Sequence, residues 1–293
     1  MDARSRPLLA ALFMTGAMLS FTLMAVAGRE ASKTHDTFEI MFFRSVLGIL
    51  IVVAFARWAG TLDQIRTRRL GLHLVRNVLH FTGQNLWFFA VTVIPLAQLF
   101  AFEFTTPIWV ALFAPLVLAE RLTPIRILAA VIGFGGILIV ARPTGFDLGW
   151  GTYAAVLCAF GFAGAILTTK LLTRTDSLTC ILFWLTVTQS VFGLITAGMD
   201  GDITLPTAAS APWVVIVGLC GLFSHWCITN ALSLAPASVV SPMEFLRLPL
   251  VAVVGFLVYS EPLDAIVFLG AAVVFGANLM NILAEQRRQN APS

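Results

Sequence analysis

Charged side chains are scarce in this 293-residue sequence. Asp, Glu, Lys and Arg together make up 11% of the chain, whereas about a quarter of the residues of a soluble domain are charged. Hydrophobic residues reach 59%, and Phe alone occurs 24 times. This composition excludes an ordinary soluble domain and predicts an all-α integral membrane protein.

The sequence also lacks the motifs of enzymes and cofactor sites. It contains no G-x-S-x-G, no H-E-x-x-H, no paired-Asp motif and no phosphate-binding loop. The four cysteines have no C-x-x-C spacing, so we interpret them as small residues of helix packing. Haem ligation by His73, His80 and His225 is disfavoured because one of the two helices offers a single histidine. We expect no enzyme activity, no metal and no cofactor.

Ten apolar segments fill almost the whole chain. A run of about 20 apolar residues is long enough to cross a bilayer as one helix. The predicted spans begin at Pro7, Phe38, Gly71, Pro95, Thr123, Trp150, Leu178, Ala211, Pro236 and Leu263. The sequence therefore predicts ten transmembrane helices and leaves no room for a soluble domain.

Basic residues are distributed unevenly among the connecting loops. If the N-terminus is cytoplasmic, 12 of the 18 Lys and Arg residues lie on the inner side and three on the outer side. The positive-inside rule then places both termini in the cytoplasm. The cluster of Arg66, Arg68 and Arg69 also suits anionic lipid or nucleic acid, but inner loops commonly have this composition. We expect the lipid bilayer as a partner and no nucleic acid.

The segment from Pro95 to Leu122 recurs as Pro236 to Leu263, an offset of 141 residues from position 95 to position 236. Pairs at this offset include Glu103/Glu244, Phe104/Phe245 and Glu120/Glu261. The offset extends in both directions, so residues 1–145 and 146–293 are predicted to be two copies of a five-helix unit. Because five is odd, the second copy is inverted in the membrane. Inverted repeats are typical of alternating-access transporters, with the substrate site at the midplane.

Short motifs at the helix ends carry a family resemblance. They are Glu-Arg-Leu-Thr at 120–123, Glu-Pro-Leu at 261–263 and Gly-Phe-Gly-Gly at 133–136. With the two five-helix repeats, they resemble the EamA-type branch of the drug/metabolite transporter superfamily. The resemblance implies movement of small metabolites, often amino-acid export across a bacterial inner membrane.

Two subgroups of that superfamily are similar to this sequence. One comprises the aromatic amino-acid exporters of the YddG type. The other comprises carriers described as S-adenosylmethionine uptake transporters, which the segment Pro-Met-Glu-Phe-Leu-Arg-Leu-Pro at 242–249 resembles. The two subgroups imply opposite directions of transport, so the resemblance leaves the direction open.

Two carboxylates, Glu103 and its repeat partner Glu244, lie inside apolar runs. A carboxylate is expensive to bury in a bilayer, which makes both residues candidates for proton coupling. The alternative is permanent neutralisation by a fixed partner. Arg247 lies one helical turn from Glu244 and is that partner in one interpretation. In the other, its guanidinium binds a substrate carboxylate.

Polar side chains form a stripe along one face of the third span. They occupy a wedge of the helix about 100° wide: His73, Arg76, Asn77, His80, Gln84 and Trp87. Such a stripe faces the protein interior and either bonds neighbouring helices or lines a site. The substrate-binding candidates are His80, Gln84, Trp87, His225 and Arg247. Arg44 and Arg76 lie nearer the ends of their spans and are expected to reach a membrane interface.

Prolines flank both carboxylates. A proline removes a helical hydrogen bond and bends the span that contains it. Pro107, Pro242 and Pro249 are therefore hinge candidates, and static kinks packed against neighbouring helices are the alternative.

The leading functional prediction is a secondary transporter that exports neutral or aromatic amino acids by alternating access. Uptake of S-adenosylmethionine or another metabolite is the alternative within this class. An intramembrane enzyme and a passive channel are alternatives from other classes. The first lacks a motif, and the second has no need of two equivalent carboxylates. A monomer is compatible with the sequence.

Overall fold

The computed structural model describes residues 6–93, 102–120, 122–141, 149–199, 202–247, 250, 253, 254, 257 and 265–290. Within these ranges, every regular element is an α-helix or a short 3₁₀ helix. The elements are α1 (Pro7–Ala31), α2 (Thr37–Trp58), η1 (Leu62–Ile65), α3 (Leu70–Val93), α5 (Thr106–Leu118), α6 (Pro124–Ala141), α7 (Trp150–Leu172), α8 (Leu178–Ala197), α9 (Ala211–Leu234), α10 (Ala237–Val240), η2 (Ser241–Leu246) and α12 (Ala265–Asn290).

Each of the ten predicted spans has a helical counterpart among these elements. The fourth span corresponds to α5, the ninth to α10 with η2, and the tenth to α12. Five helices, α1, α2, α7, α8 and α9, are long and apolar enough to cross a membrane. The predicted helix starts agree with the structure to within a few residues where the helix is uninterrupted, as at α3 and α8.

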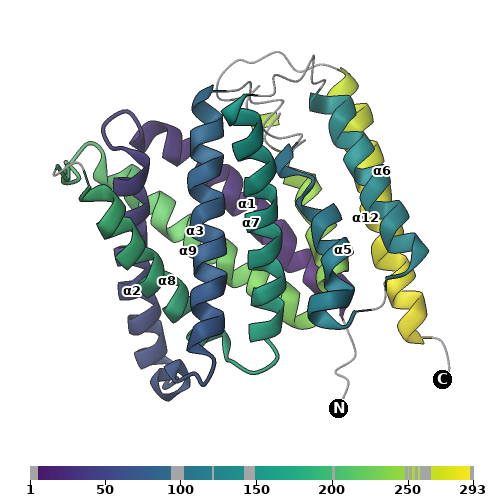
Figure 1. Ribbon diagram of the computed structural model, residues 1–293, viewed down its shortest axis with the longest axis horizontal. Helices are drawn as coiled ribbons and strands as arrows, with labels where there is room; N and C mark the ends of the chain where they lie inside the picture. The colour runs from purple at the N-terminus through teal and green to yellow at the C-terminus, as the bar shows by residue number, and fades with distance from the viewer. Residues whose placement is uncertain are drawn as a thin grey trace.

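The helices pack in pairs that follow the internal repeat. The offset of 141 residues carries α1 onto α7 and α3 onto α9, and the structure packs α1 along α9 and α3 along α7. The other two main pairs, α2 with α8 and α6 with α12, each join a helix to its own repeat partner. Figure 1 shows these two pairs at opposite ends of the molecule. The approximate two-fold axis that relates the two halves of the protein therefore passes through both of these pairs.

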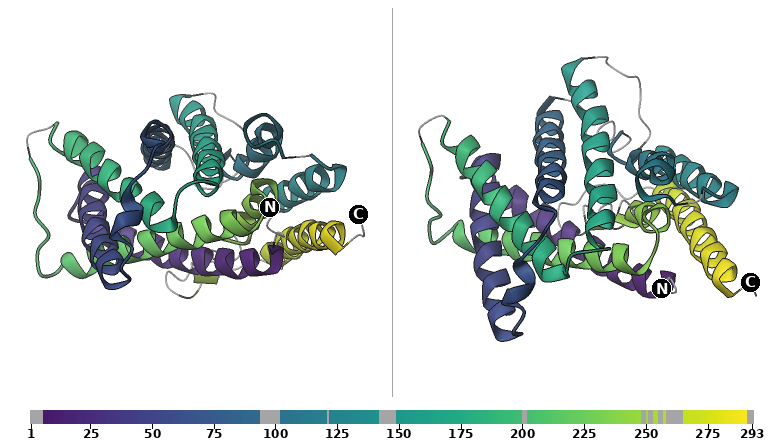
Figure 2. Two further views of the ribbon diagram at one scale, coloured as in Figure 1. Left: turned by 90° about the horizontal axis from the view of Figure 1, so that it is seen from below. Right: turned by 60° about the horizontal axis from the view of Figure 1, so that its bottom comes forward.

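The two equivalent pairs form separate layers. Figure 2 shows α3 and α7 on one face of the molecule, with α1 and α9 on the other and crossing them steeply. Residues that lie between the layers are contributed by both repeats. The polar stripe of α3 faces the protein interior, where Arg76 and Asn77 bond α7 and α8 and His80 lies against His225 of α9.

Small residues occupy the closest approach in both equivalent pairs. A Cβ atom on Gly161 of α7 would lie only 3.0 Å from the Cα atom of Gly83 on α3. The repeat offset carries these two glycines to Ser20 and Ser224. The Ser20 hydroxyl donates a hydrogen bond to a carbonyl oxygen of α9 (3.0 Å). Two backbones can approach closely only where side chains are small, and the same two positions meet that requirement in each repeat.

The fourth and ninth spans are both interrupted beside their carboxylates. In the described part of the fourth span, Phe102 and Glu103 are helical, Phe104 and Thr105 form a turn, and α5 begins at Thr106. In the ninth span, α10 passes at Ser241 into the 3₁₀ helix η2, which contains Glu244. Broken helices of this kind are common at the binding sites of inverted-repeat transporters, where unwound backbone can face a ligand.

The hinge candidates Pro107 and Pro242 lie near the breaks beside the carboxylates. Pro107 lies in the first turn of α5, and Pro242 lies in the first turn of η2, which follows α10 directly. Proline suits that position because its missing N–H would have no intrahelical partner there. Pro249 lies outside the described residues. A hinge role for Pro107 and Pro242 therefore concerns the breaks that precede them.

One end of the bundle is closed by contacts between the repeats. The Glu120 carboxylate, just after α5, accepts hydrogen bonds from the backbone N–H of Ala237 (2.9 Å) and the hydroxyl of Ser238 (2.8 Å). It thereby satisfies a donor of the first turn of α10. The backbone N–H of Arg6, before α1, donates to the carbonyl oxygen of Leu234 at the end of α9 (2.7 Å). The start of α1 and the end of α12 lie at this same end (Figure 1). Glu261, the repeat partner of Glu120, lies outside the described residues.

Candidate functional site

Glu103 is bound by side chains from both repeats. Its carboxylate accepts a hydrogen bond from the indole N–H of Trp87 on α3 (2.5 Å) and forms an ion pair with Arg247, which directly follows η2. Trp87 and Glu103 belong to the first repeat and Arg247 to the second. The ion pair therefore joins the two halves of the protein at the point where the fourth and ninth spans are interrupted.

The partner of Arg247 differs from the predicted one. The sequence placed Glu244 one turn away and offered it as the fixed partner, whereas the guanidinium bonds Glu103, 144 positions distant in the chain. Glu244 remains close enough to interact with Arg247 and with Glu103 through their charges. Spacing along one segment reveals only neighbours within that segment. The ion pair depends on how the fourth and ninth spans face each other.

Aromatic rings surround the Arg247 guanidinium. Its central carbon lies 5.3 Å from the centroid of the Phe104 ring and 5.8 Å from that of Phe21 on α1. Cations are attracted to ring faces at such distances. Phe104 also packs edge-to-face on its repeat partner Phe245, with centroids 6.1 Å apart. The charged pair thus lies within an apolar, aromatic environment.

Two histidines extend the polar region toward α9. The ring of His80 on α3 lies 4.8 Å from that of His225, centroid to centroid, and both residues are buried. His225 packs edge-to-face against Phe21 at 6.2 Å. Phe21 therefore contacts both the histidine pair and Arg247. We refer to the six side chains joined in this way as the central site: Phe21, His80, Trp87, Glu103, His225 and Arg247.

The structure brings most of the predicted binding residues together. His80 lies against His225, and Trp87 and Arg247 bind the same carboxylate. Gln84 lies on α3 between His80 and Trp87, and its amide oxygen is buried without a hydrogen-bond partner among the described residues. Phe21 was not predicted. Phe is abundant along the whole chain, so nothing in the sequence distinguished this one.

The prediction that Arg44 and Arg76 reach a membrane interface is wrong. Arg76 is 4% exposed, and it donates to the hydroxyl of Thr169 (3.1 Å) and the amide oxygen of Asn77 (2.8 Å). Arg44 lines an internal cavity between α2, α8 and α9. Depth along one helix suggested snorkelling, but the packing of α7, α8 and α9 around these side chains keeps them inside the protein.

A second polar cluster lies near the start of α8. His73 of α3 bonds the carboxylate of Asp176 (2.7 Å), which also accepts from Thr67 (2.7 Å). Burial opposes ionisation of Asp176, but the hydrogen bonds from Thr67 and His73 outweigh it and hold the pKa of this carboxyl below its usual range. The Sγ atom of Cys180 lies 3.9 Å from both groups, a spacing in which three ligands could surround a metal. The His73–Asp176 hydrogen bond already satisfies the pair, and it ties α3 to the connection between α7 and α8.

The packing of equivalent helices, the broken fourth and ninth spans and the buried charges between the repeats together define a secondary transporter of the inverted-repeat class. The chain belongs to the EamA-like transporter family, whose model matches residues 8–142 and 149–283. It is a multi-pass membrane protein with ten helices in two inverted five-helix repeats, it carries small metabolites, and it is not an enzyme.

Two relatives described as transporters align along nearly the full chain. A riboflavin transporter of Rhizobium johnstonii is 29% identical over 99% of this chain and 96% of its own length. An S-adenosylmethionine uptake transporter of Rickettsia prowazekii is 24% identical over 94% of this chain and 92% of its own length. One crystal structure covers 95% of this chain and 98% of its own at 16% identity, with a TM-score of 0.81, and shows the fold alone. These relatives support the EamA family and give no support to the YddG type.

Proposed function

We propose that this protein carries a small solute with a flat ring across a bacterial inner membrane, and that the ring binds in the central site. The observation that carries the proposal is the aromatic environment of the Glu103–Arg247 pair, with Trp87 on one side and Phe21 and Phe104 on the other. Flat rings pack well against such walls, while a few polar groups orient them.

Two kinds of solute fit this description. An aromatic amino acid is the solute predicted from the sequence, and riboflavin is the solute named for the Rhizobium johnstonii relative. Both combine a flat ring with hydrogen-bonding groups, which His80, His225 and Gln84 can bind. S-adenosylmethionine, named for the Rickettsia prowazekii relative, combines a purine ring with a sulfonium cation. Because Glu103 already neutralises Arg247, the charges of the site do not exclude this cation, and S-adenosylmethionine is a third candidate.

The charges of the central site suggest how transport is coupled. Glu103 and Glu244 both interact with one guanidinium, that of Arg247. Two carboxylates and one guanidinium leave one negative charge in excess, and burial favours its neutralisation by a proton. The Glu103–Arg247 pair also spans the two repeats, so it must change when the repeats move against each other. Glu103 and Glu244 thus remain the candidates for proton coupling.

The breaks in the fourth and ninth spans are the proposed points of bending. Thr105, before Pro107, and Ser241, before Pro242, lie where the regular α-helix is interrupted. Movement there would shift Glu103 and Glu244 without unfolding a complete helix. Each break lies within a few residues of its carboxylate. Protonation of the carboxylate and bending at the break, which changes the side from which the site is accessible, can therefore affect each other directly.

Counterflow in proteoliposomes tests this proposal. Vesicles are loaded with unlabelled riboflavin, phenylalanine, tryptophan or S-adenosylmethionine, and uptake of the labelled solute is followed with and without a pH gradient. We expect transient accumulation of label with riboflavin or an aromatic amino acid, because a carrier exchanges one solute for another. Trp87→Phe keeps the ring and removes the N–H that binds Glu103, and it should slow exchange. Trp58→Phe at an exposed position is the matched control.

Equilibration without transient accumulation would indicate a channel and contradict the proposal. Accumulation of labelled S-adenosylmethionine alone would still indicate a carrier. It would contradict the proposal that the central site binds the flat ring of a neutral or anionic solute. The direction of transport under a pH gradient distinguishes export from uptake.

A further inference from the structure

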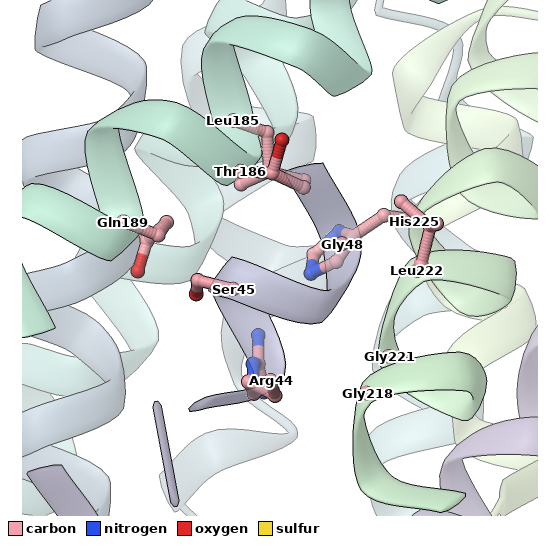
Figure 3. A pocket seen from close by; sticks show the side chains of 10 residues that line it. All are labelled: Arg44, Ser45, Gly48, Leu185, Thr186, Gln189, Gly218, Gly221, Leu222 and His225. Carbon is pink, nitrogen blue, oxygen red and sulfur yellow. The ribbon is translucent and has the colours of Figure 1, made fainter. Parts of the chain in front are cut away.

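A small internal cavity lies beside the central site, between α2, α8 and α9. Figure 3 shows Arg44 from α2, Thr186 and Gln189 from α8 and His225 from α9 around it. Its volume of about 20 Å³ is room for little more than one water molecule. The cavity is therefore too small for a whole metabolite and large enough for one polar group.

The positive charge beside this cavity is not balanced. The guanidinium groups of Arg44 and Arg76 are close enough to repel each other. Arg76 bonds only neutral acceptors, and no carboxylate in the described ranges pairs with either arginine. An unpaired charge removed from water costs several kcal/mol. A protein can retain two unpaired arginines at such a cost when a negatively charged group binds them during function.

Buried polar atoms around the arginines also lack partners. Gln189 is 2% exposed and lines the cavity, and its amide oxygen has no hydrogen-bond partner among the described residues. The Nδ1 atom of His80, which is 8% exposed and lies against His225, has none either. Buried polar groups are normally paired. A ligand that brings an oxyanion and a hydrogen-bond donor would satisfy these groups together.

One residue is shared by the cavity and the central site. His225 lines the cavity, and its ring lies against His80 and Phe21 of the central site. A solute that contacts Phe21 and His225 therefore lies one side chain away from the cavity that Arg44 lines. Gly218 and Gly221 of α9 leave this space open, since a Cβ atom on Gly221 would lie 3.7 Å from the Arg44 guanidinium carbon.

Building on the proposed function, we propose that Arg44, supported by Arg76, forms an oxyanion subsite for the carboxylate or phosphate group of the transported solute. The transported solutes are then flat rings with an anionic head, such as an aromatic amino acid or a flavin phosphate. Arg247 does not have this role, because Glu103 already occupies its guanidinium. The sequence had offered Arg247 as the carboxylate anchor, and the structure moves that role to α2.

The test uses the full-length protein and two matched pairs of solutes. In each pair the acid member has the anionic group, and the neutral member has an uncharged ester or hydroxyl group in its place. The pairs are phenylalanine with its methyl ester, and riboflavin 5′-phosphate with riboflavin, each used to compete in counterflow. Arg44→Gln should weaken the acid member of each pair about tenfold or more, the range for a lost charged hydrogen bond. The neutral members should be unchanged. Arg57→Gln, in the last turn of the same helix, is the matched control.

A melting experiment on the purified protein provides an independent measurement. An unpaired charge that is partly removed from water opposes folding, so Arg44→Gln should raise the melting temperature without solute by about 2 to 4 °C. Phenylalanine, riboflavin 5′-phosphate or inorganic phosphate should stabilise the wild type and not the variant. Gly221→Ala, which narrows the cavity by an ordinary contact, should reduce this stabilisation without lowering the melting temperature.

Three outcomes would overturn the subsite. They are equal effects of Arg44→Gln on acid and neutral solutes, a lower melting temperature for that variant, and no stabilisation by any anion. Transport of riboflavin that does not depend on Arg44 would leave the proposed function intact and reject the subsite alone. Stabilisation by inorganic phosphate but by neither organic anion would identify a site for a free anion and reject the proposed solute class.

Discussion

The Glu103 carboxylate binds two side chains of the central site, one from each repeat. It accepts from Trp87 and binds Arg247, and it interacts by charge with Glu244. The two carboxylates occupy equivalent positions of the repeat, but their surroundings are not equivalent, since only Glu103 bonds the guanidinium directly. The helices of the two repeats are therefore equivalent, but the contacts of their two buried carboxylates are not.

This asymmetry predicts different stabilities for the two amide variants. Glu103→Gln should lower the stability of the protein by about 3 kcal/mol, the low end for breaking a buried ion pair, because Arg247 retains 20% exposure. Glu244→Gln should cost much less, because the Arg247–Glu103 bond remains. Melting curves of both variants in the same detergent measure the difference. A larger loss for Glu244→Gln would return Glu244 to the partner role that the sequence suggested.

At the scale of elements, the crossing of α3 and α7 depends on the absence of two side chains. Gly161 faces the backbone of α3, where a Cβ atom would lie 2.9 Å from the carbonyl oxygen of Leu79. A backbone atom cannot rotate out of the way as the end of a side chain can. The whole helix must shift, and α3 holds two residues of the central site, His80 and Trp87.

We therefore predict that Gly161→Ala destabilises the protein. Alanine gains about 1 kcal/mol over glycine in a helix, and overpacking costs about 1 to 3 kcal/mol, so the net effect is a loss of up to about 2 kcal/mol. Gly135→Ala in α6 has no atom within 4 Å of the new Cβ and should gain stability. Melting temperatures that move in the same direction for both variants would reject the close contact.

At the scale of the whole molecule, the inverted repeat explains why helices far apart in the chain are neighbours. The pairs α1 with α9 and α3 with α7 are the same contact made twice, and α2 with α8 and α6 with α12 lie on the two-fold relation. A change of access to the opposite side needs only an exchange of the conformations of the two halves. The end of the bundle at Glu120, which is closed in this structure, is the end that would open in such an exchange.

The orientation in the membrane remains a prediction from the distribution of basic residues. Single cysteines at Thr123 and Ser260, close to Glu120 and Glu261, should react with an impermeant maleimide from the cytoplasm and the periplasm respectively. The four native cysteines are buried, so the background should be low. Reaction of both from one side contradicts inversion of the second repeat. Reaction of the Thr123 cysteine from the periplasm and of the Ser260 cysteine from the cytoplasm would still support the inversion, but it would place both termini outside the cytoplasm.

The membrane class, the number of spans, the repeat and its inversion could all be predicted from the amino-acid sequence. These follow from composition, from segment length and from one constant offset, and none of them depends on where a side chain points. The sequence also identified the buried carboxylates and the polar stripe of α3, because a charge or an amide inside an apolar run is visible in one dimension.

Which of these groups meet depends on the packing of the helices. The structure pairs Arg247 with Glu103 in place of Glu244, buries Arg76, places Arg44 beside a cavity between helices, and brings Phe21 between His225 and Arg247. It also shows that the fourth and ninth spans are interrupted close to Pro107 and Pro242. The physical reason is common to these cases. Helical spacing defines the neighbours within one helix, whereas the partner of a buried charge is chosen by the packing of helices that can lie more than a hundred residues apart.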